Sequence, residues 1–176
     1  MANTLLGGLG SFIRRRIFVS YHHAGDQAYY DAFSRTFHDG YETIRDNSLD
    51  RTIDSEATDY VMRRIREDFI HGSSCTIVLC GAGTPWRKYV DWEIKATLDK
   101  QHGIIGVNLP TNSPNSVGKF VVPDRLHDNI ESGYAIWTDW NTLTYSSENL
   151  RLTIEAANSK SKLLISNGRP MRSRNG

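Results

Sequence analysis

Short apolar runs and stretches with helical spacing alternate along this chain of 176 residues. Runs rich in β-branched and aromatic residues predict strands at 16–21, 75–80, 104–109 and 134–138. The stretch 40–50 is polar and holds at most a short strand near 43–45. Apolar residues spaced three or four positions apart predict helices at 26–39, 55–71, 84–101 and 147–165, with a single turn at 123–129. The stretch 110–122 is rich in Asn, Ser, Pro and Gly, and this composition indicates an irregular loop.

Strands that alternate with helices are typical of right-handed βαβ units. The pattern therefore predicts an α/β fold of the flavodoxin-like, doubly wound type, with a mainly parallel five-stranded sheet in a three-layer α/β/α arrangement. We expect one domain at 15–166, a flexible N-terminal segment at 1–14 and a basic C-terminal tail at 167–176. In such a sheet the ligand crevice lies outside the carboxyl ends of the strands.

The composition, with 39% hydrophobic and 23% charged residues, is typical of a soluble globular protein. A formal net charge of +1 gives no bulk attraction to nucleic acid, and no apolar run is long enough to span a membrane. The apolar stretch 2–13 precedes the basic residues 14–16, which is the wrong order for a secretory signal. We therefore expect a cytoplasmic protein.

The two cysteines, Cys75 and Cys80, lie five positions apart in one predicted strand and so point to opposite faces of the sheet. We expect both to be reduced thiols. They have no histidine pair nearby that would complete a zinc site. The sequence thus indicates neither a metal nor a tightly bound cofactor.

Glu93 is the first candidate for chemistry, because it lies on a predicted helix among apolar and aromatic residues just after a strand. Trp86 and Glu93 fall on one face of the helix predicted at 84–101, two turns and roughly 10 Å apart. An aromatic ring and a carboxylate at this separation are suited to binding a nucleoside, with the base stacked on the ring and a ribose hydroxyl held by the carboxylate. The alternative is that Glu93 is a solvated surface residue that pairs with Lys88 or Lys95.

Four segments reach the carboxyl edge of the predicted sheet: Tyr21–His23, Asp46–Ser48, Gly81–Trp86 and the loop after Leu109. Adjacent strand residues point in opposite directions, so His22 and His23 cannot both face one site. The alternative for this pair is a surface turn. Short polar clusters such as Asp46–Ser48 commonly form turns, and Gly81–Gly83 fits either a tight strand-to-helix turn or a close approach to phosphate.

Four motifs, at 16–23, 46–49, 76–81 and 86–94, occur in an order that resembles the bacterial TIR-like domains. This group includes the sensor protein of the Thoeris anti-phage system. The resemblance covers roughly residues 15–140, and the match around Glu93 is its strongest part. It identifies the predicted domain at 15–166 as TIR-like.

The resemblance implies an enzyme that cleaves NAD at the nicotinamide–ribose bond, with some members cyclising the ADP-ribose product into a signal. Glu93 matches the position of the catalytic glutamate, Tyr21 and His22 match the polar end of the first strand, and Ser48 matches the loop that borders the nucleotide. We add Asp46 and Trp86 to the substrate-binding candidates. NAD is then a substrate rather than a cofactor, and the implied partner is an effector that senses the nucleotide product, while homo-oligomerisation stays open.

Two alternatives remain beside the NAD-consuming enzyme. The first is a non-catalytic TIR-like adaptor that recruits partners through its helical faces and leaves Glu93 facing solvent. The second is another glycosyl-bond enzyme on the same fold, such as a nucleoside deoxyribosyltransferase, which also relies on a glutamate. The length and composition of the loop at 110–122 suggest a lid over the site.

Overall fold

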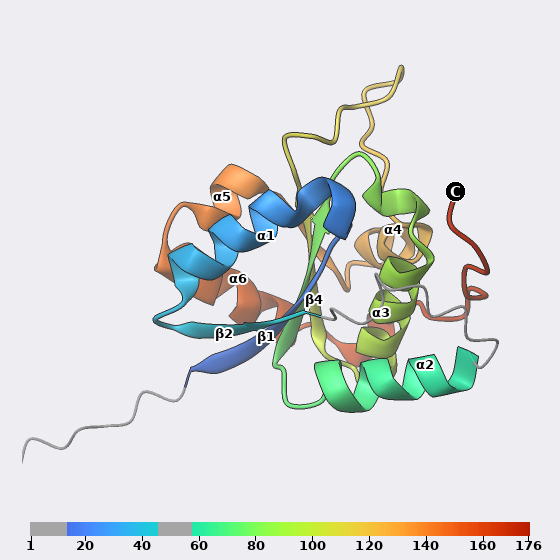
Figure 1. Ribbon diagram of the computed structural model, residues 1–176, viewed down its shortest axis with the longest axis horizontal. Coiled ribbons are helices and arrows are strands. Elements are labelled where there is room, and N and C mark those ends of the chain that lie inside the picture. The colour runs from blue at the N-terminus through green and yellow to red at the C-terminus, as the bar shows by residue number, and fades with distance from the viewer. Residues whose placement is uncertain (1–13, 46–57) are drawn as a thin grey trace, which may run out of the picture.

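The computed structural model describes residues 14–45 and 58–176, and these form a sheet with helices on both faces (Figure 1). All strand pairs are parallel, and the strand order is β2-β1-β3-β4-β5. The strands are β1 (Arg15–Ser20), β2 (Tyr41–Ile44), β3 (Cys75–Cys80), β4 (Gly103–Asn108) and β5 (Ile136–Asp139). The predicted flavodoxin-like, five-stranded parallel sheet is therefore confirmed.

The helices divide between the two faces of the sheet, as Figure 1 shows with α1, α5 and α6 on one side and α2, α3 and α4 on the other. The first layer contains α1 (His23–Phe37), α5 (Trp140–Thr144) and α6 (Ser147–Asn158). The second contains α2 (Thr58–Arg64), its π-helical continuation η1 (Ile65–Ile70), α3 (Lys88–Asp99) and α4 (Asp124–Glu131). Two short 3₁₀ segments are η2 (Thr84–Trp86) and η3 (Lys162–Leu164).

The core follows the alternation of side chains along the buried strands. In β1, Val19 packs on the α1 side of the sheet, whereas its neighbour Phe18 packs against α2 and α3. In β3, Cys75 and Cys80 are both fully buried free thiols in the clusters of opposite faces, as their spacing predicted. Burial raises the pKa of Cys75 to about 12 and raises that of Cys80 as well, so neither is a reactive thiolate.

Several predicted boundaries differ from the observed ones. The helix predicted at 84–101 is divided at Arg87, whose extended backbone (φ −92°, ψ 118°) separates η2 from α3. The single turn predicted at 123–129 is the two-turn helix α4, and the short helix α5 was not predicted. The closing helix ends at Asn158 rather than near Ile165. The early end of the closing helix is an error at an element end, where spacing gives the weakest signal, whereas the break at Arg87 and the five-residue helix α5 are too short to produce a helical pattern of their own.

No helix in the described ranges is long and apolar enough to cross a membrane. The predicted N-terminal segment lies outside the described residues except for Arg14. The loop at 110–122 stands away from the body of the domain at the carboxyl edge of the sheet (Figure 1). Its base is tied by Asn112, which donates to the side chain of Asn108 (3.0 Å) and to the backbone oxygen of Val121 (3.2 Å).

Candidate functional site

Glu93 lies on α3 with its side chain directed at the sheet rather than at solvent. Its exposed fraction is 5%, which excludes the alternative of a solvated surface residue. The Oγ of Ser20, the last residue of β1, donates a short hydrogen bond of 2.5 Å to Glu93 Oε2. A buried carboxylate is costly unless it is hydrogen-bonded, and Ser20 supplies one such bond. Lys88 and Lys95, the surface partners considered from sequence, contact other groups: Lys95 pairs with Asp99, and the Lys88 ammonium lies 5.0 Å from the Tyr89 ring centroid.

The orientation of Glu93 is fixed one helical turn further along by Thr97. The Thr97 hydroxyl lies 2.8 Å from the Thr76 hydroxyl of β3 and also donates to the backbone oxygen of Glu93 at 2.9 Å. Residues four apart share one helical face, so the same face of α3 contacts β1 through Glu93 and β3 through Thr97. Glu93 and Thr97 therefore lie on one face of α3. This packing places the carboxylate at the carboxyl edge of the sheet.

Ser20 is a site residue that the sequence did not single out. The only signal was a hydroxyl at the end of an otherwise apolar strand, and such a residue commonly satisfies a local backbone group instead.

We expect Ser20→Ala to leave the buried carboxylate without this donor and to lower the free energy of unfolding by about 1–3 kcal/mol. Urea denaturation at pH 7 measures the effect. Ser74→Ala is the matched control, because its exposed hydroxyl makes a longer bond of 3.3 Å to a backbone oxygen. Equal unfolding midpoints for Ser20→Ala and the control would contradict a supporting role for Ser20.

Tyr21, the residue after Ser20, contacts the other face of the sheet. Its ring stacks on Tyr30 of α1 with centroids 4.9 Å apart, and its hydroxyl accepts from Arg45 Nη1 at 2.7 Å and donates to Gln27 at 2.9 Å. Burial raises the pKa of Tyr21, with the Arg45 contact acting in the opposite direction. The described contacts of Tyr21 thus belong to the α1 layer, whereas those of Glu93 belong to α3.

The adjacent histidines also diverge, but not through strand alternation: β1 ends at Ser20, His22 is the N-cap residue of α1, and His23 is the first residue of that helix. The His23 ring stacks on Tyr21 with centroids 4.2 Å apart. The His22 ring packs on Gly83, where a Cβ placed on the glycine would lie 2.6 Å from Nδ1, so there is no room for a side chain. His22 therefore lies against the loop between β3 and α3, and this loop leads into the helix that carries Glu93.

Asp26 is a second residue that the sequence treated only as a helix start. It lies in the first turn of α1 with an exposed fraction of 2%, and its Oδ2 accepts from the Thr84 hydroxyl at 3.0 Å. A Cβ at Gly81 would lie 2.2 Å from Asp26 Oδ1, so only glycine fits there. The segment Gly81–Thr84 is therefore a tight turn from β3 into η2 that is locked by a buried carboxyl group, and Asp26 fixes where η2 begins.

Burial raises the pKa of Asp26 above its ordinary value, while the Thr84 hydrogen bond acts in the opposite direction. Asp26 therefore binds its proton more tightly in the folded protein than in the unfolded chain. Above the pKa of the folded state, where Asp26 is ionised, it lowers the free energy of unfolding. That cost is relieved as the pH falls through the folded pKa toward the unfolded value.

We expect Asp26→Asn to equal or exceed the wild type in thermal midpoint at pH 7 and to lose this advantage near pH 4. Thermal unfolding at the two pH values tests the prediction. Asp39→Asn, at a carboxyl group whose side chain is 90% exposed, is the control. A variant that is less stable than the wild type at pH 7 but not at pH 4 would show that the charged carboxylate is net stabilising.

Trp86 does not share a helix with Glu93, which corrects the sequence interpretation. It ends η2, and the break at Arg87 removes the helical register on which the common face depended. Its indole is 46% exposed, its ring centroid lies 5.9 Å from the Arg172 guanidinium, and its backbone oxygen accepts from Gly176 N at 3.0 Å. The indole and the backbone oxygen of Trp86 therefore contact C-terminal residues, while its backbone nitrogen donates to Gly83.

Asp46 and Ser48, the remaining predicted site residues, lie outside the described residues, so their placement stays a prediction. No group of three or more His, Cys, Asp or Glu in the ranges 14–45 and 58–176 has the arrangement of a metal site. The described site offers a buried carboxylate, an adjacent hydroxyl and a rigid turn at the carboxyl edge of a parallel sheet. Such an arrangement is suited to holding a sugar hydroxyl and stabilising positive charge beside it.

The five-stranded parallel sheet in the order 2-1-3-4-5, with a buried glutamate on the helix that follows its central strand, makes this a flavodoxin-like α/β domain. A family profile described as "Thoeris protein ThsB, TIR-like domain" matches residues 18–114, more than half of the sequence. The chain therefore belongs to the Thoeris ThsB TIR-like domain family.

The chain also matches part of a solved structure described as "Structure of the activated Roq1 resistosome directly recognizing the pathogen effector XopQ (TIR domains)". The sequence identity is 14% and the TM-score is 0.38, over 55% of this chain and 58% of that chain. No curated protein matches the sequence.

Proposed function

We propose that this protein cleaves NAD at the nicotinamide–ribose bond, with Glu93 as the catalytic carboxylate. The observation that carries the proposal is the burial of Glu93 at the carboxyl edge of the sheet, where its Oε2 is held by Ser20. Ligands of open α/β sheets bind at this edge. Membership in the Thoeris ThsB family supports the same chemistry, because TIR domains commonly process NAD.

The reaction needs little acid catalysis, because nicotinamide leaves as a neutral molecule with the electron pair of the glycosidic bond. The ribose that remains carries oxocarbenium character, and a carboxylate fixed beside it stabilises that positive charge. If water attacks the cation, the products are ADP-ribose and a proton. If a nucleobase nitrogen of the same molecule attacks instead, the product is cyclic, and exclusion of water favours this outcome.

The other predicted site residues take supporting roles in this proposal. Trp86 stacks on the nucleobase, and His22 lies beside the turn that leads into α3. Asp46 and Ser48 border the nucleotide from the loop after β2. Tyr21 supports this edge from the α1 side through its hydroxyl contacts with Gln27 and Arg45.

The cyclic product is our proposed signal, and the recipient is a partner effector that senses nucleotides during anti-phage defence. NAD is the substrate in this scheme. The protein acts in the cytoplasm, where NAD is available. The loop at 110–122, which stands at the same edge of the sheet, is our candidate for the lid that excludes water.

The direct test is incubation of the purified protein with NAD, followed by chromatography and mass spectrometry of the products. We expect free nicotinamide together with one equivalent of ADP-ribose, in the cyclic or linear form. Because an enzyme of this kind can await a trigger, the same products are also measured in cells that express the protein, before and after phage infection. A protein that releases no nicotinamide in vitro, and leaves cellular NAD unchanged on infection, would contradict the proposal.

The same experiment separates the alternative functions. A nucleoside deoxyribosyltransferase would exchange the base of deoxynucleosides, so these are included as substrates. The adaptor hypothesis expected Glu93 to face solvent, and its exposed fraction of 5% does not favour that hypothesis.

A further inference from the structure

The C-terminal residues 166–176, which we call the strap, run along α3 from its end back to its beginning, as the chain near the C-terminus in Figure 1 shows. At the start of the strap, Ser166 exchanges two hydrogen bonds with Asn129 of α4, and Asn167 donates to Asp99 near the end of α3. At the other end, Gly176 reaches Trp86. The strap therefore connects α4 and α3 to the carboxyl edge of the sheet.

The first part of the strap is held by buried groups. Arg125 of α4 is fully buried and donates to Asn167 Oδ1 (2.9 Å), to the Pro170 oxygen (3.1 Å) and to Asp91 of α3 (2.9 Å). Asp91 also accepts from the backbone nitrogen of Arg172 at 2.8 Å. Because these polar groups satisfy one another away from water, residues 166–172 form a fixed base.

The last four residues, 173–176, are held by exposed contacts at the beginning of α3. Asn175 Oδ1 accepts from the backbone nitrogen of Lys88 at 2.9 Å, and Gly176 N donates to the Trp86 oxygen at 3.0 Å. Gly176 also lies against the indole, since a Cβ placed on it would be 3.3 Å from Trp86 Cβ and 3.7 Å from Cε3. This tip of the strap therefore covers part of an aromatic ring that is otherwise available to a ligand.

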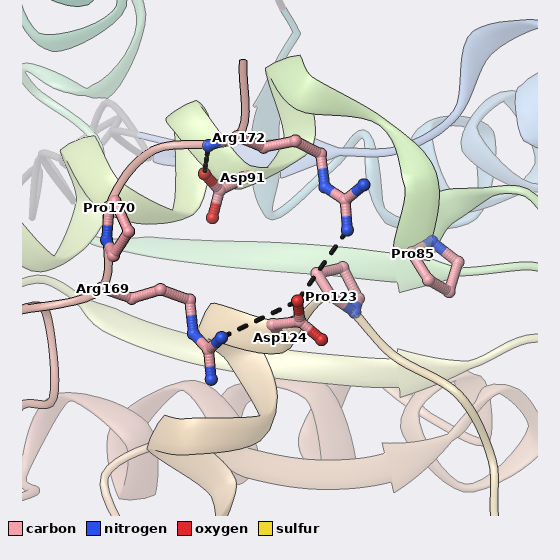
Figure 2. Close-up of a pocket in the computed structure, with 7 residues that line it drawn as sticks. All are labelled: Pro85, Asp91, Pro123, Asp124, Arg169, Pro170 and Arg172. Carbon is pink, nitrogen blue, oxygen red and sulfur yellow. Dashed lines mark hydrogen bonds and ion pairs between the residues drawn. The ribbon is translucent and has the colours of Figure 1, made fainter. Parts of the chain in front are cut away.

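The strap does not pack fully against the domain near the junction of its base and its tip. A pocket of about 200 Å³ lies there, lined by Pro85, Asp91, Pro123, Asp124, Arg169, Pro170 and Arg172 (Figure 2). Across it, the guanidinium groups of Arg169 and Arg172 each approach Asp124 only to 3.8 Å. These ion pairs belong to the base, where Arg169 is also held by Asp128 at 2.8 Å. The described contacts of the tip are the two exposed hydrogen bonds of Asn175 and Gly176, so the tip can lift while the base stays in place.

We propose that the tip of the strap, residues 173–176, is a gate on Trp86: in the closed form it covers part of the indole, and in the open form the whole ring is free to stack on a nucleobase. The gate rests on the proposed function, because it assigns Trp86 to the nucleotide. Two exposed hydrogen bonds correspond to a closed-to-open ratio on the order of ten. The apparent affinity for the nucleotide is reduced by the same factor.

The test is truncation of the protein after Arg172, which removes both tip contacts and leaves every buried contact of the base intact. We expect the KM for NAD to fall by about three- to tenfold with kcat unchanged. Asn175→Ala, which removes one of the two contacts, gives a smaller decrease. Arg174→Ala is the matched control, because it changes a tip residue without removing either contact.

Repeating the truncation in a Trp86→Ala protein tests whether the tip acts through the indole. We expect the truncation to have no effect on KM in this background. A truncation that leaves the KM of the wild type unchanged, or that lowers KM equally in both backgrounds, overturns the gate.

Hydroxyl-radical footprinting of Trp86 by mass spectrometry gives a readout that does not depend on NAD. We expect oxidation of Trp86 to rise about twofold on truncation, since the indole is 46% exposed in the closed form. Unchanged oxidation overturns the gate whatever the activity. If truncation increases the oxidation of Trp86 but the protein neither binds nor cleaves NAD, the proposed function is contradicted, whereas the contact between the tip and Trp86 is supported.

Discussion

Replacing Glu93 with Gln is expected to lower the rate of nicotinamide release at least 100-fold. The substitution keeps the shape of the side chain and its ability to accept from Ser20, but it removes the negative charge that faces the developing cation. Loss of one preorganised electrostatic contact in an active site costs about 10²–10³ in kcat. Because the charge acts in the transition state rather than in substrate binding, the KM for NAD is expected to change much less.

The measurement is a time course of nicotinamide under saturating NAD, for the wild type and for Glu93→Gln. Glu131→Gln is the matched control, because this carboxylate lies on α4 with its side chain 72% exposed. We expect the control to retain wild-type activity. If Glu93→Gln releases nicotinamide as fast as the wild type, Glu93 is not the catalytic carboxylate.

Replacing Arg125 with Ala is expected to be the most destabilising single substitution in the described part of the chain. The guanidinium is fully buried and pairs with Asp91, itself only 6% exposed, so its removal leaves a buried carboxylate without its cation. Breaking a buried ion pair from one side costs about 3–5 kcal/mol. For a domain of this size the thermal midpoint is then expected to fall by roughly 6–20 °C.

Differential scanning calorimetry measures this effect, and hydrogen exchange shows where it acts. Because Arg125 also donates to Asn167 and Pro170, we expect faster exchange of the backbone along residues 166–172. Arg151→Ala is the control: Arg151 pairs with Glu148 and Glu155 on the surface of α6, and its loss is expected to leave the midpoint almost unchanged. Equal midpoints for the Arg125 and Arg151 variants would show that the buried pair does not hold the strap.

Four of the five strands were predictable because each carries its own apolar signal, whereas the polar stretch that contains β2 indicated at most a short strand. A continuous apolar run such as Cys75–Cys80 is buried on both faces and needs no knowledge of the rest of the chain to be recognised. The parallel order of the sheet followed from the alternation of strands and helices. Helix ends were predicted less well, since the break at Arg87 depends on backbone angles that the apolar spacing does not encode.

The candidate site was predictable only in part. The sequence pointed to Glu93, because a carboxylate among apolar residues after a strand destabilises the fold unless it faces a cleft and binds something. The four ordered motifs pointed to the TIR-like family. It also predicted that His22 and His23 would diverge. It placed Trp86 on the same helical face as Glu93, which was wrong, because that inference assumed one continuous helix.

The sequence by itself thus determined the sheet, the family and the identity of the candidate carboxylate, since each rests on residues that are close together in the chain. Only the tertiary structure decided which groups surround that carboxylate. Ser20 and Glu93 are 73 positions apart, and Asp26 reaches Thr84 across 58 positions. Contacts of this kind depend on how a helix packs against a sheet, and local spacing carries no information about that packing.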